Sequence, residues 1–292
     1  MDYKTAILNE DYIKKDIVKI FKNSTLFYNN LFLDSDLAET LDEIFLKIKE
    51  GRSLYGKWMQ KINDKERLLS VPINPLRKFF DSYLVEFIKQ GEIHERCHGG
   101  EKGWSPKSSL ESHLPISCAF SFDLRGAFEN IAYSKVYNLF YDYLKDFSCR
   151  EMVADFFSML CTVKYSEGRG LPQGSSISMA LFNRILFPLD NKLCNKANEK
   201  GFKYSRWVDD ITITSDEHRD EGSFIGALEI VVKDFPLSDN KVFFQNSGKI
   251  FLLGHKILNN QVLKNTKEER MKEKNKPLDY GNIFSRKYEH WF

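Results

Sequence analysis

The sequence predicts a mixed α+β fold in which antiparallel strand pairs are interleaved with helices. Two observations lead to this prediction: apolar residues recur at helical spacing in several segments, and runs of β-forming residues flank short polar turns between those segments. The chain has 292 residues, of which 42% are hydrophobic, so it can bury a sizeable core. This composition excludes a wholly disordered or fibrous protein.

The first part of the chain is expected to be helical over residues 11–50. It is rich in helix formers, and a start signal of two acidic residues and a serine stands at 34–36. Gly51 and Gly56 interrupt this pattern. The apolar residues on one helical face are Leu37, Leu41, Ile44, Phe45 and Ile48.

A hairpin and a further helix follow. Two β-forming runs at 57–62 and 67–73 flank a polar turn, and residues 76–90 have the amphipathic spacing of a helix. The other elements are expected in this order: a loop at 97–109, a strand at 117–123, helices at 132–144 and 152–160, a strand at 162–165, a loop at 168–174, one long helix at 178–196 with Pro188 as a candidate kink, strands at 204–208 and 211–214, a helix at 224–235, and strands at 241–245 and 249–253.

Charge, cysteines and hydropathy narrow the class of protein. The net charge is only +2, but residues 241–292 carry a net charge of +6, which favours either a polyanionic partner or an ordinary solvated surface. The five cysteines are scattered and form no Cys-X-X-Cys pair, as expected of a reduced cytoplasmic protein without zinc or disulfides. No apolar run approaches the ~20 residues of a membrane-spanning helix, and the charged first 11 residues are unlike a signal peptide, so no membrane association is expected.

An acidic pair stands out at Asp209 and Asp210. These residues lie between the β-forming runs 204–208 and 211–214, where a tight turn can bring both carboxylates to one end of a sheet. Burying such acids without a cation is costly, which indicates a cation site. An isolated pair of this kind is more often a solvent-exposed turn.

A third acid strengthens the functional interpretation. Asp123 ends the apolar strand predicted at 117–123, a position well suited to a ligand of a hard cation. Asp123 and Asp209 together could hold two Mg²⁺ ions about 3.5–4 Å apart, the geometry for in-line phosphoryl transfer. Taken alone, Asp123 could equally be a capping acid at a strand end.

A glycine-containing loop at 169–175 runs into the next predicted helix. Gly170 and Gly174 allow close approach to the backbone, and the serines that follow are suitable helix caps. Such a loop can seat a nucleotide or base pair against the backbone. Alone, it could be a simple loop–helix junction.

In this order and spacing, the three segments resemble the palm motifs of a reverse transcriptase. The resemblance covers residues 52–258 and includes a hairpin similar to that of the fingers. It is nearer to bacterial retron-like, phage-defence-associated and group II intron-related enzymes than to retroviral ones. The matching residues are Phe122-Asp123, Ala127-Phe128, Leu171-Pro172-Gln173-Gly174 and Trp207-Val208-Asp209-Asp210.

The resemblance implies a right-hand polymerase fold of fingers and palm, with an antiparallel palm sheet and packed helices and with the thumb reduced or missing. The implied parts are an N-terminal helical segment (1–50), fingers (51–120), a palm (121–258) with a helical fingers insertion at about 132–165, and a basic, aromatic tail (259–292) that serves as a minimal thumb or docking segment.

The resemblance also implies roles for single residues. Asp123, Asp209 and Asp210 would be catalytic metal ligands for two Mg²⁺ ions, with Mn²⁺ as an alternative ion, and Lys241 would protonate the leaving pyrophosphate. His113, which precedes the first palm motif, is equally consistent with a structural and a functional role. The implied substrate-binding residues are Lys61, Arg67, Leu124, Phe128, Gln173 and Gly174, and the implied primer grip is Leu253 and Gly254.

Phe128 carries a substrate prediction. It lies five residues after Asp123, where the family places an aromatic ring beneath the sugar of the nucleotide. A ring there would clash with a 2′-hydroxyl, so the resemblance implies dNTP as substrate and disfavours an RNA polymerase. A core phenylalanine is the alternative, since the chain has 24 phenylalanines.

The implied function is that of an RNA-directed DNA polymerase that extends a primer with dNTPs along a structured non-coding RNA and makes a DNA product, in a bacterial retron-like or anti-phage system. Two alternatives stay open: protein-primed or template-independent synthesis by the same site, and an inactive RNA-binding scaffold. Only 38 residues follow Gly254, fewer than a usual thumb. Either the chain is a truncated form, or the tail, the RNA, a protein partner or self-association is expected to replace the thumb.

Overall fold

The computed structural model describes residues 2–23, 33–62, 65–237, 241–246 and 249–264. The chain forms two compact units, each built from two separate stretches of sequence. Unit 1 comprises residues 1–92 and 128–185, and unit 2 comprises residues 93–127 and 186–292. The division falls at other positions than the expected boundaries of fingers and palm, which stay a prediction.

Unit 1 is mainly helical, because its apolar residues recur at helical spacing and gather around a core of phenylalanines. The rings of Phe21, Phe79 and Phe157 meet with centroids 6.0–6.4 Å apart, and Phe45 stacks on Phe156 at 5.1 Å. The helices are α1 (Tyr3–Leu8), α2 (Glu10–Asn23), α3 (Leu33–Lys49), α4 (Leu76–Phe79) with the π-helical turn η1 (Phe80–Leu84), α5 (Val85–Lys89), α7 (Tyr133–Tyr143), α8 (Arg150–Cys161) and α9 (Ser176–Ile185).

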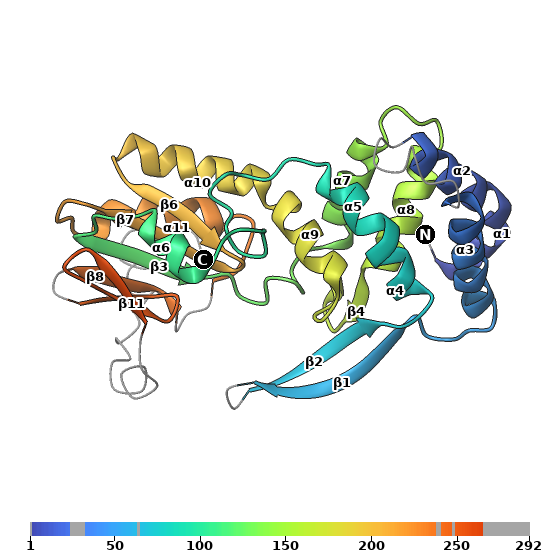
Figure 1. Cartoon of the computed structure of the whole chain (residues 1–292), viewed down its shortest axis with the longest axis horizontal. Helices are drawn as coiled ribbons and strands as arrows, with labels where there is room; N and C mark the ends of the chain where they lie inside the picture. The colour runs from blue at the N-terminus through green and yellow to red at the C-terminus, as the bar shows by residue number, and fades with distance from the viewer. Residues whose placement is uncertain (1, 24–32, 63–64, 238–240, 247–248, 265–292) are drawn as a thin grey trace, which may run out of the picture. The chain divides into compact units, whose positions relative to one another are not determined.

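Two strand pairs complete unit 1. Strands β1 (Tyr55–Ile62) and β2 (Lys65–Pro72) form an antiparallel hairpin, and Figure 1 shows this hairpin projecting from the α4 end of the unit. Strands β4 (Val163–Tyr165) and β5 (Gly168–Gly170) form a shorter antiparallel pair directly before α9. The expected fingers-like hairpin is therefore present, with both strands longer than predicted.

Unit 2 is built on a four-stranded antiparallel sheet with the order β6-β7-β3-β8. Helix α10 (Phe187–Glu199) packs against β6 and against α11 (Ile225–Val231), which follows the 3-10 turn η2 (Glu221–Phe224) (Figure 1). The strands of this sheet are β3 (Cys118–Asp123), β6 (Lys203–Trp207), β7 (Asp210–Ser215) and β8 (Phe243–Asn246).

A second, three-stranded sheet of unit 2 has the order β11-β10-β9. Its apolar side chains form one buried cluster with Leu110 of α6 (Pro106–Glu111) and Ala119 of β3. Burial of this apolar surface attaches the small sheet to the larger one. The strands are β9 (Ile250–Leu252), β10 (His255–Leu258) and β11 (Gln261–Lys264).

Several expected elements are wrong in extent. The single helix expected at 178–196 is two helices, since α9 ends at Ile185 and α10 starts at Phe187 with Pro188 in its first turn, where a missing N–H costs nothing. The expected loop at 168–174 begins with strand β5. The expected loop at 97–109 ends in α6, which Ser105 caps through a reciprocal capping box with Ser108.

The predicted helix at 224–235 is also shorter, because its helical turns end at Val231. Most of the predicted tail, residues 265–292, lies outside the described residues. None of the helices that the structure describes is both long and apolar enough to span a bilayer.

His113 links the two strands that carry the acidic pair. Its ring is buried, with Nδ1 2.8 Å from Thr214 Oγ1 on β7 and Nε2 2.7 Å from Ser205 Oγ on β6. Burial lowers the pKa of His113 to about 3, so the ring is neutral near pH 7 and can donate one hydrogen bond and accept the other. These contacts give His113 a structural role.

We expect His113→Leu to lower the free energy of unfolding by about 1–3 kcal/mol, because two buried hydroxyls lose a partner. Urea denaturation measures this loss. The matched control is His218→Leu, at an exposed position of the same unit. An equal loss in both variants would contradict the bridging role.

Candidate active site

The three predicted acids come together at one end of β3 and β7, the two central strands of the main sheet of unit 2. Antiparallel pairing of β3 with β7 sets Asp123, the last residue of β3, directly opposite Asp210, the first of β7. The Leu124 N–H donates to the carbonyl of Asp209 at 3.0 Å and closes the gap between the two strand ends. As a result, Asp123, Asp209 and Asp210 each offer a carboxylate oxygen within 4.8 Å of the others.

The turn that carries Asp209 has a strained backbone. Val208 has φ +58°, a left-handed conformation that a β-branched residue rarely adopts. The turn is therefore made by Val208 and Asp209, and Asp210 already belongs to β7 rather than to the turn. The backbone of Gly99 packs directly against this turn. A Cβ atom at residue 99 would lie 2.1 Å from the Val208 nitrogen, so only glycine fits there.

The electrostatics of the cluster favour a cation. Burial first, and then the charges of Asp209 and Asp123, raise the pKa of Asp210 to about 7, an effect that Lys241 partly offsets. Asp123 is 6% exposed and forms an ion pair with the ammonium group of Lys241, whose side chain is about half exposed. Burial and the two neighbouring carboxylates outweigh the attraction of Lys241 in setting the pKa of Asp210.

These residues fit a divalent cation on the chemistry of their donor atoms. Carboxylate oxygens are hard ligands of the kind that Mg²⁺ and similar ions bind. The three carboxylates lie together at the ends of β3 and β7, and Asp123 belongs to a mostly buried strand. The candidate metal ligands predicted from the sequence are thus brought together, with Lys241 beside them.

Unit 1 holds the second group of predicted residues, around the loop before α9. The Gln173 carbonyl accepts a hydrogen bond from the Ser70 N–H of β2 at 2.8 Å, and the Gln173 side chain donates to Glu129 at 3.2 Å. Gly174 has φ +97°, and a Cβ there would lie 2.9 Å from Val71 Cγ2. The close approach that Gly174 permits in this structure is therefore that of strand β2.

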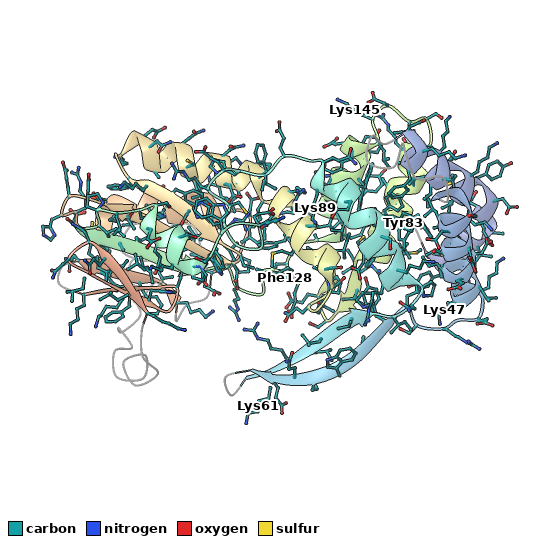
Figure 2. The ribbon with its side chains drawn as sticks, in the orientation of Figure 1. Lys47, Lys61, Tyr83, Lys89, Phe128 and Lys145 are labelled. Atoms are coloured by element: carbon teal, nitrogen blue, oxygen red, sulfur yellow. The ribbon has the colours of Figure 1, made fainter. Side chains whose placement is uncertain are left out.

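Phe128 lies beside the same loop. Its carbonyl accepts a hydrogen bond from the Leu171 N–H at 2.9 Å, and its ring stacks on Phe182 of α9 with centroids 4.9 Å apart. The ring is only partly buried, and Figure 2 labels Phe128 next to α9. The ring is thus packed on Phe182 and partly exposed, and its role as a steric gate stays a prediction.

Lys61 and Arg67 are not brought together on one face of the hairpin. In the register of β1 and β2, Lys61 lies opposite Glu66 and Arg67 lies opposite Gln60. Because successive residues of a strand point to opposite faces, the two cations lie on different faces of the ribbon. Both are exposed, and Figure 2 shows Lys61 near the end of the hairpin.

The register also decides which cation is nearer to the loop before α9. Arg67 shares its face with Leu69 and Val71, the two side chains closest to Gly174. Arg67 is therefore the cation on the loop-facing side of the hairpin.

Three further predicted residues, Leu124, Leu253 and Gly254, have structural roles in strand ends and turns. The Leu124 N–H donates to the Asp209 carbonyl, and its side chain is buried, so Leu124 joins the end of β3 to the turn before β7. Leu253 and Gly254 form the turn between β9 and β10, with φ +48° and +73°. Leu253 packs against the buried cluster of the small sheet, which holds this turn in place.

Sequence reasoning missed the polar support beneath the acidic turn. Asp190 of α10 and Arg206 of β6 are both fully buried and form an ion pair at 2.7 Å. The detectable signal was an aspartate within an otherwise apolar helical face, because an acid is almost never fully buried unless it is paired.

Known proteins are similar to this chain in sequence and in fold. Among curated proteins, the chain is 25% identical over 175 residues to Retron Mx162 reverse transcriptase and 27% identical over 163 residues to Retron Mx65 reverse transcriptase, both of Myxococcus xanthus. These matches cover 55% and 52% of this chain but 35% and 38% of those proteins, so the chain spans well under half of their length.

Among solved structures, the chain is similar in fold to the apo telomerase of Candida tropicalis, with a TM-score of 0.50, 14% identity, and 72% of this chain and 55% of that chain covered. A family model described as reverse transcriptase (RNA-dependent DNA polymerase) matches residues 53–257, more than half of the chain. The chain therefore belongs to the reverse transcriptase family.

Proposed function

We propose that this protein is an RNA-directed DNA polymerase that adds dNTPs to a primer by metal-assisted phosphoryl transfer. The observation that carries the proposal is the cluster of Asp123, Asp209 and Asp210 at the ends of β3 and β7, within the segment that matches the family. An inactive scaffold has no need for like charges held this close together, since each raises the free energy of the others.

The proposed cofactor is a pair of Mg²⁺ ions, with Mn²⁺ as a substitute. Asp123 and Asp209 would bind both ions, and Asp210 would be a weaker ligand. Such ions activate the primer 3′-hydroxyl and neutralise charge on the triphosphate. Lys241 is proposed as the acid for the leaving pyrophosphate, because its ammonium already lies at Asp123.

Unit 1 is proposed to bind the incoming nucleotide. Gln173 and Phe128 would contact the base and sugar side, and Arg67 the phosphates, with Lys61 as a second cation. The primer would rest on the turn of Leu253 and Gly254. The proposed domain boundaries are those of the resemblance, with fingers at 51–120 and a palm at 121–258.

The proposed partners are dNTPs, a structured non-coding RNA that acts as template, and the DNA product. The support is the similarity to proteins named as retron reverse transcriptases. Sequencing of the RNA bound to the purified protein, and of any DNA joined to it, tests this choice. DNA attached to a tyrosine, or synthesis unaffected by ribonuclease, would favour protein-primed or template-independent synthesis instead.

Asp209→Asn is expected to lower the rate of primer extension by about 10³-fold or more, because ion binding at the reacting centre supplies several kcal/mol. Extension of a labelled primer on an RNA template measures the rate. The control is Asp216→Asn, just beyond the other end of β7, which should keep wild-type activity. Unimpaired extension by a folded Asp209→Asn protein would end the proposal.

Phe128→Ala is expected to raise the use of NTP relative to dNTP by about tenfold or more, since removal of the ring opens space for a 2′-hydroxyl. The ratio of kcat/KM for the two nucleotides is the measurement. Phe187→Ala, at another partly buried phenylalanine, controls for general loss of packing. Unchanged discrimination in Phe128→Ala would remove the gate assignment.

The raised pKa of Asp210 predicts how the stability of the metal-free protein depends on pH. A carboxyl whose folded-state pKa is raised from 3.8 to about 7 destabilises the fold when it is ionised, so its contribution to stability falls as the pH rises between these values. Thermal unfolding in chelator from about pH 4 to pH 8 should show that the stability of the wild type relative to Asp210→Asn falls as the pH rises.

Mg²⁺ added near pH 8 should restore the melting temperature of the wild type more than that of Asp210→Asn, because the ion balances Asp209, Asp210 and Asp123 together. The pH profiles of the two proteins share every other titrating group, including His113. Parallel profiles would therefore show that Asp210 ionises without cost.

A further inference from the structure

A buried polar cluster lies directly behind the acidic turn. Arg206 and Asp190 are both fully buried, with Nε 2.7 Å from Oδ1 and Nη2 2.8 Å from Oδ2, a bidentate pair. The Tyr204 hydroxyl also donates to Asp190 Oδ1 at 2.6 Å. Asp190 thus receives three hydrogen bonds, which compensate for the burial of its charge.

The guanidinium reaches beyond Asp190 to the turn itself. Arg206 Nη1 donates to the Val208 carbonyl at 2.7 Å, and Nη2 also donates to Cys97 Sγ at 3.0 Å. Val208 is the residue with φ +58°, immediately before Asp209. One rigid side chain therefore connects helix α10 to the strained residue that orients Asp209.

The backbone of Arg206 is anchored as firmly as its side chain. Its N–H donates to the Arg96 carbonyl at 2.9 Å, and its carbonyl accepts from His98 and Gly99 at 2.9 and 3.3 Å. Since both ends of the residue are held, the guanidinium has little freedom to move. Hydrogen bonds of Arg206 thus link the Val208 carbonyl to α10 and to the segment 96–99.

Stability alone does not explain why Arg206 and Asp190 are buried as an ion pair. A buried ion pair gives up the hydration of both charges, and well-packed apolar residues of similar volume often stabilise a fold equally well. A planar fork with several donors can hold Asp190 and the Val208 carbonyl at the same time, whereas a lysine ammonium is a single point charge.

We propose that Arg206, held by Asp190, is a positioning residue for catalysis: it stabilises the left-handed conformation of Val208 and thereby keeps the Asp209 carboxylate in reach of Asp123 and Asp210. The inference rests on the proposed function, because the position of Asp209 matters only if the cluster binds metal. It assigns a role to two residues outside the acidic cluster.

The test compares two substitutions in the same buried cluster. Arg206→Lys keeps a positive charge beside Asp190 but cannot bond Asp190 and the Val208 carbonyl together. We expect kcat for primer extension to fall by about 10²-fold and the Mg²⁺ concentration for half-maximal rate to rise, with little change in the KM for dNTP.

Tyr204→Phe is the matched control, since it removes a hydrogen bond to Asp190 and leaves the link from Arg206 to Val208 intact. Its kcat and Mg²⁺ dependence should stay close to those of the wild type. Melting temperatures of both variants show how much stability each has lost.

A second pair of variants tests the strain directly. In a Val208→Gly background the left-handed conformation costs less, so Arg206→Lys should lower kcat by a smaller factor there than in the wild-type background. An equal factor in both backgrounds would overturn the proposed link between Arg206 and the turn.

The outcomes are distinguishable from failure of the proposed function. If the wild type extends primers and Asp209→Asn does not, but a folded Arg206→Lys protein matches Tyr204→Phe in kcat and Mg²⁺ dependence, the positioning role is wrong and the polymerase is not. If Arg206→Lys fails to fold, Asp190→Asn takes its place, with the same expectation of a lowered kcat and a raised Mg²⁺ requirement. If neither variant folds, the pair is a stability element and the positioning proposal falls.

Discussion

The pairing of β3 with β7 is the constraint on which the candidate site depends. It sets Asp123 opposite Asp210 and leaves Asp209 at the tip of the adjoining turn. Burial, and then repulsion by Asp209 and Asp123, hold the pKa of Asp210 far above its ordinary value. The surrounding fold must therefore supply the free energy that keeps them in place, and a bound cation would relieve the same repulsion.

That free energy comes from contacts around the strand ends that carry the three acids. His113 ties β6 to β7, the Leu124 N–H ties the end of β3 to Asp209, and Gly99 leaves room for the backbone of Val208. The ion pair of Arg206 and Asp190 adds a link from helix α10. Local strain at an active site persists when its surroundings over-determine it, and these contacts are what over-determine this turn.

The loop before α9 follows the same principle in unit 1. Gly174 allows β2 to approach closely, and the Ser70 N–H bonds the Gln173 carbonyl, so the hairpin and the loop are joined by backbone contacts. Phe128 is attached to the loop through Leu171 and to α9 through Phe182. The residues proposed to bind the nucleotide are thus mutually supported before any nucleotide is present.

Much of this could be predicted from the sequence, because it depends on local pattern. Hydrophobic spacing located most helices and strands, and the order of Asp123, Gln173-Gly174 and Asp209-Asp210 identified the family that residues 53–257 confirm. Local pattern failed at two strand pairs, because pairing register sets both the strand at Gly168–Gly170 and the opposite faces of Lys61 and Arg67. It also failed at the break between α9 and α10, where Pro188 lies in the first turn of α10.

The clearest division concerns the acidic turn. The sequence alone determined which three carboxylates form the site, since their residue types and spacing are written along the chain. Only the tertiary structure decided how they are held, because Asp190, His113 and Gly99 contact the turn or its flanking strands across 16 to 109 positions of sequence. Burial makes such distant partners necessary, since a buried charge or a strained backbone is stable only when neighbouring groups compensate for it.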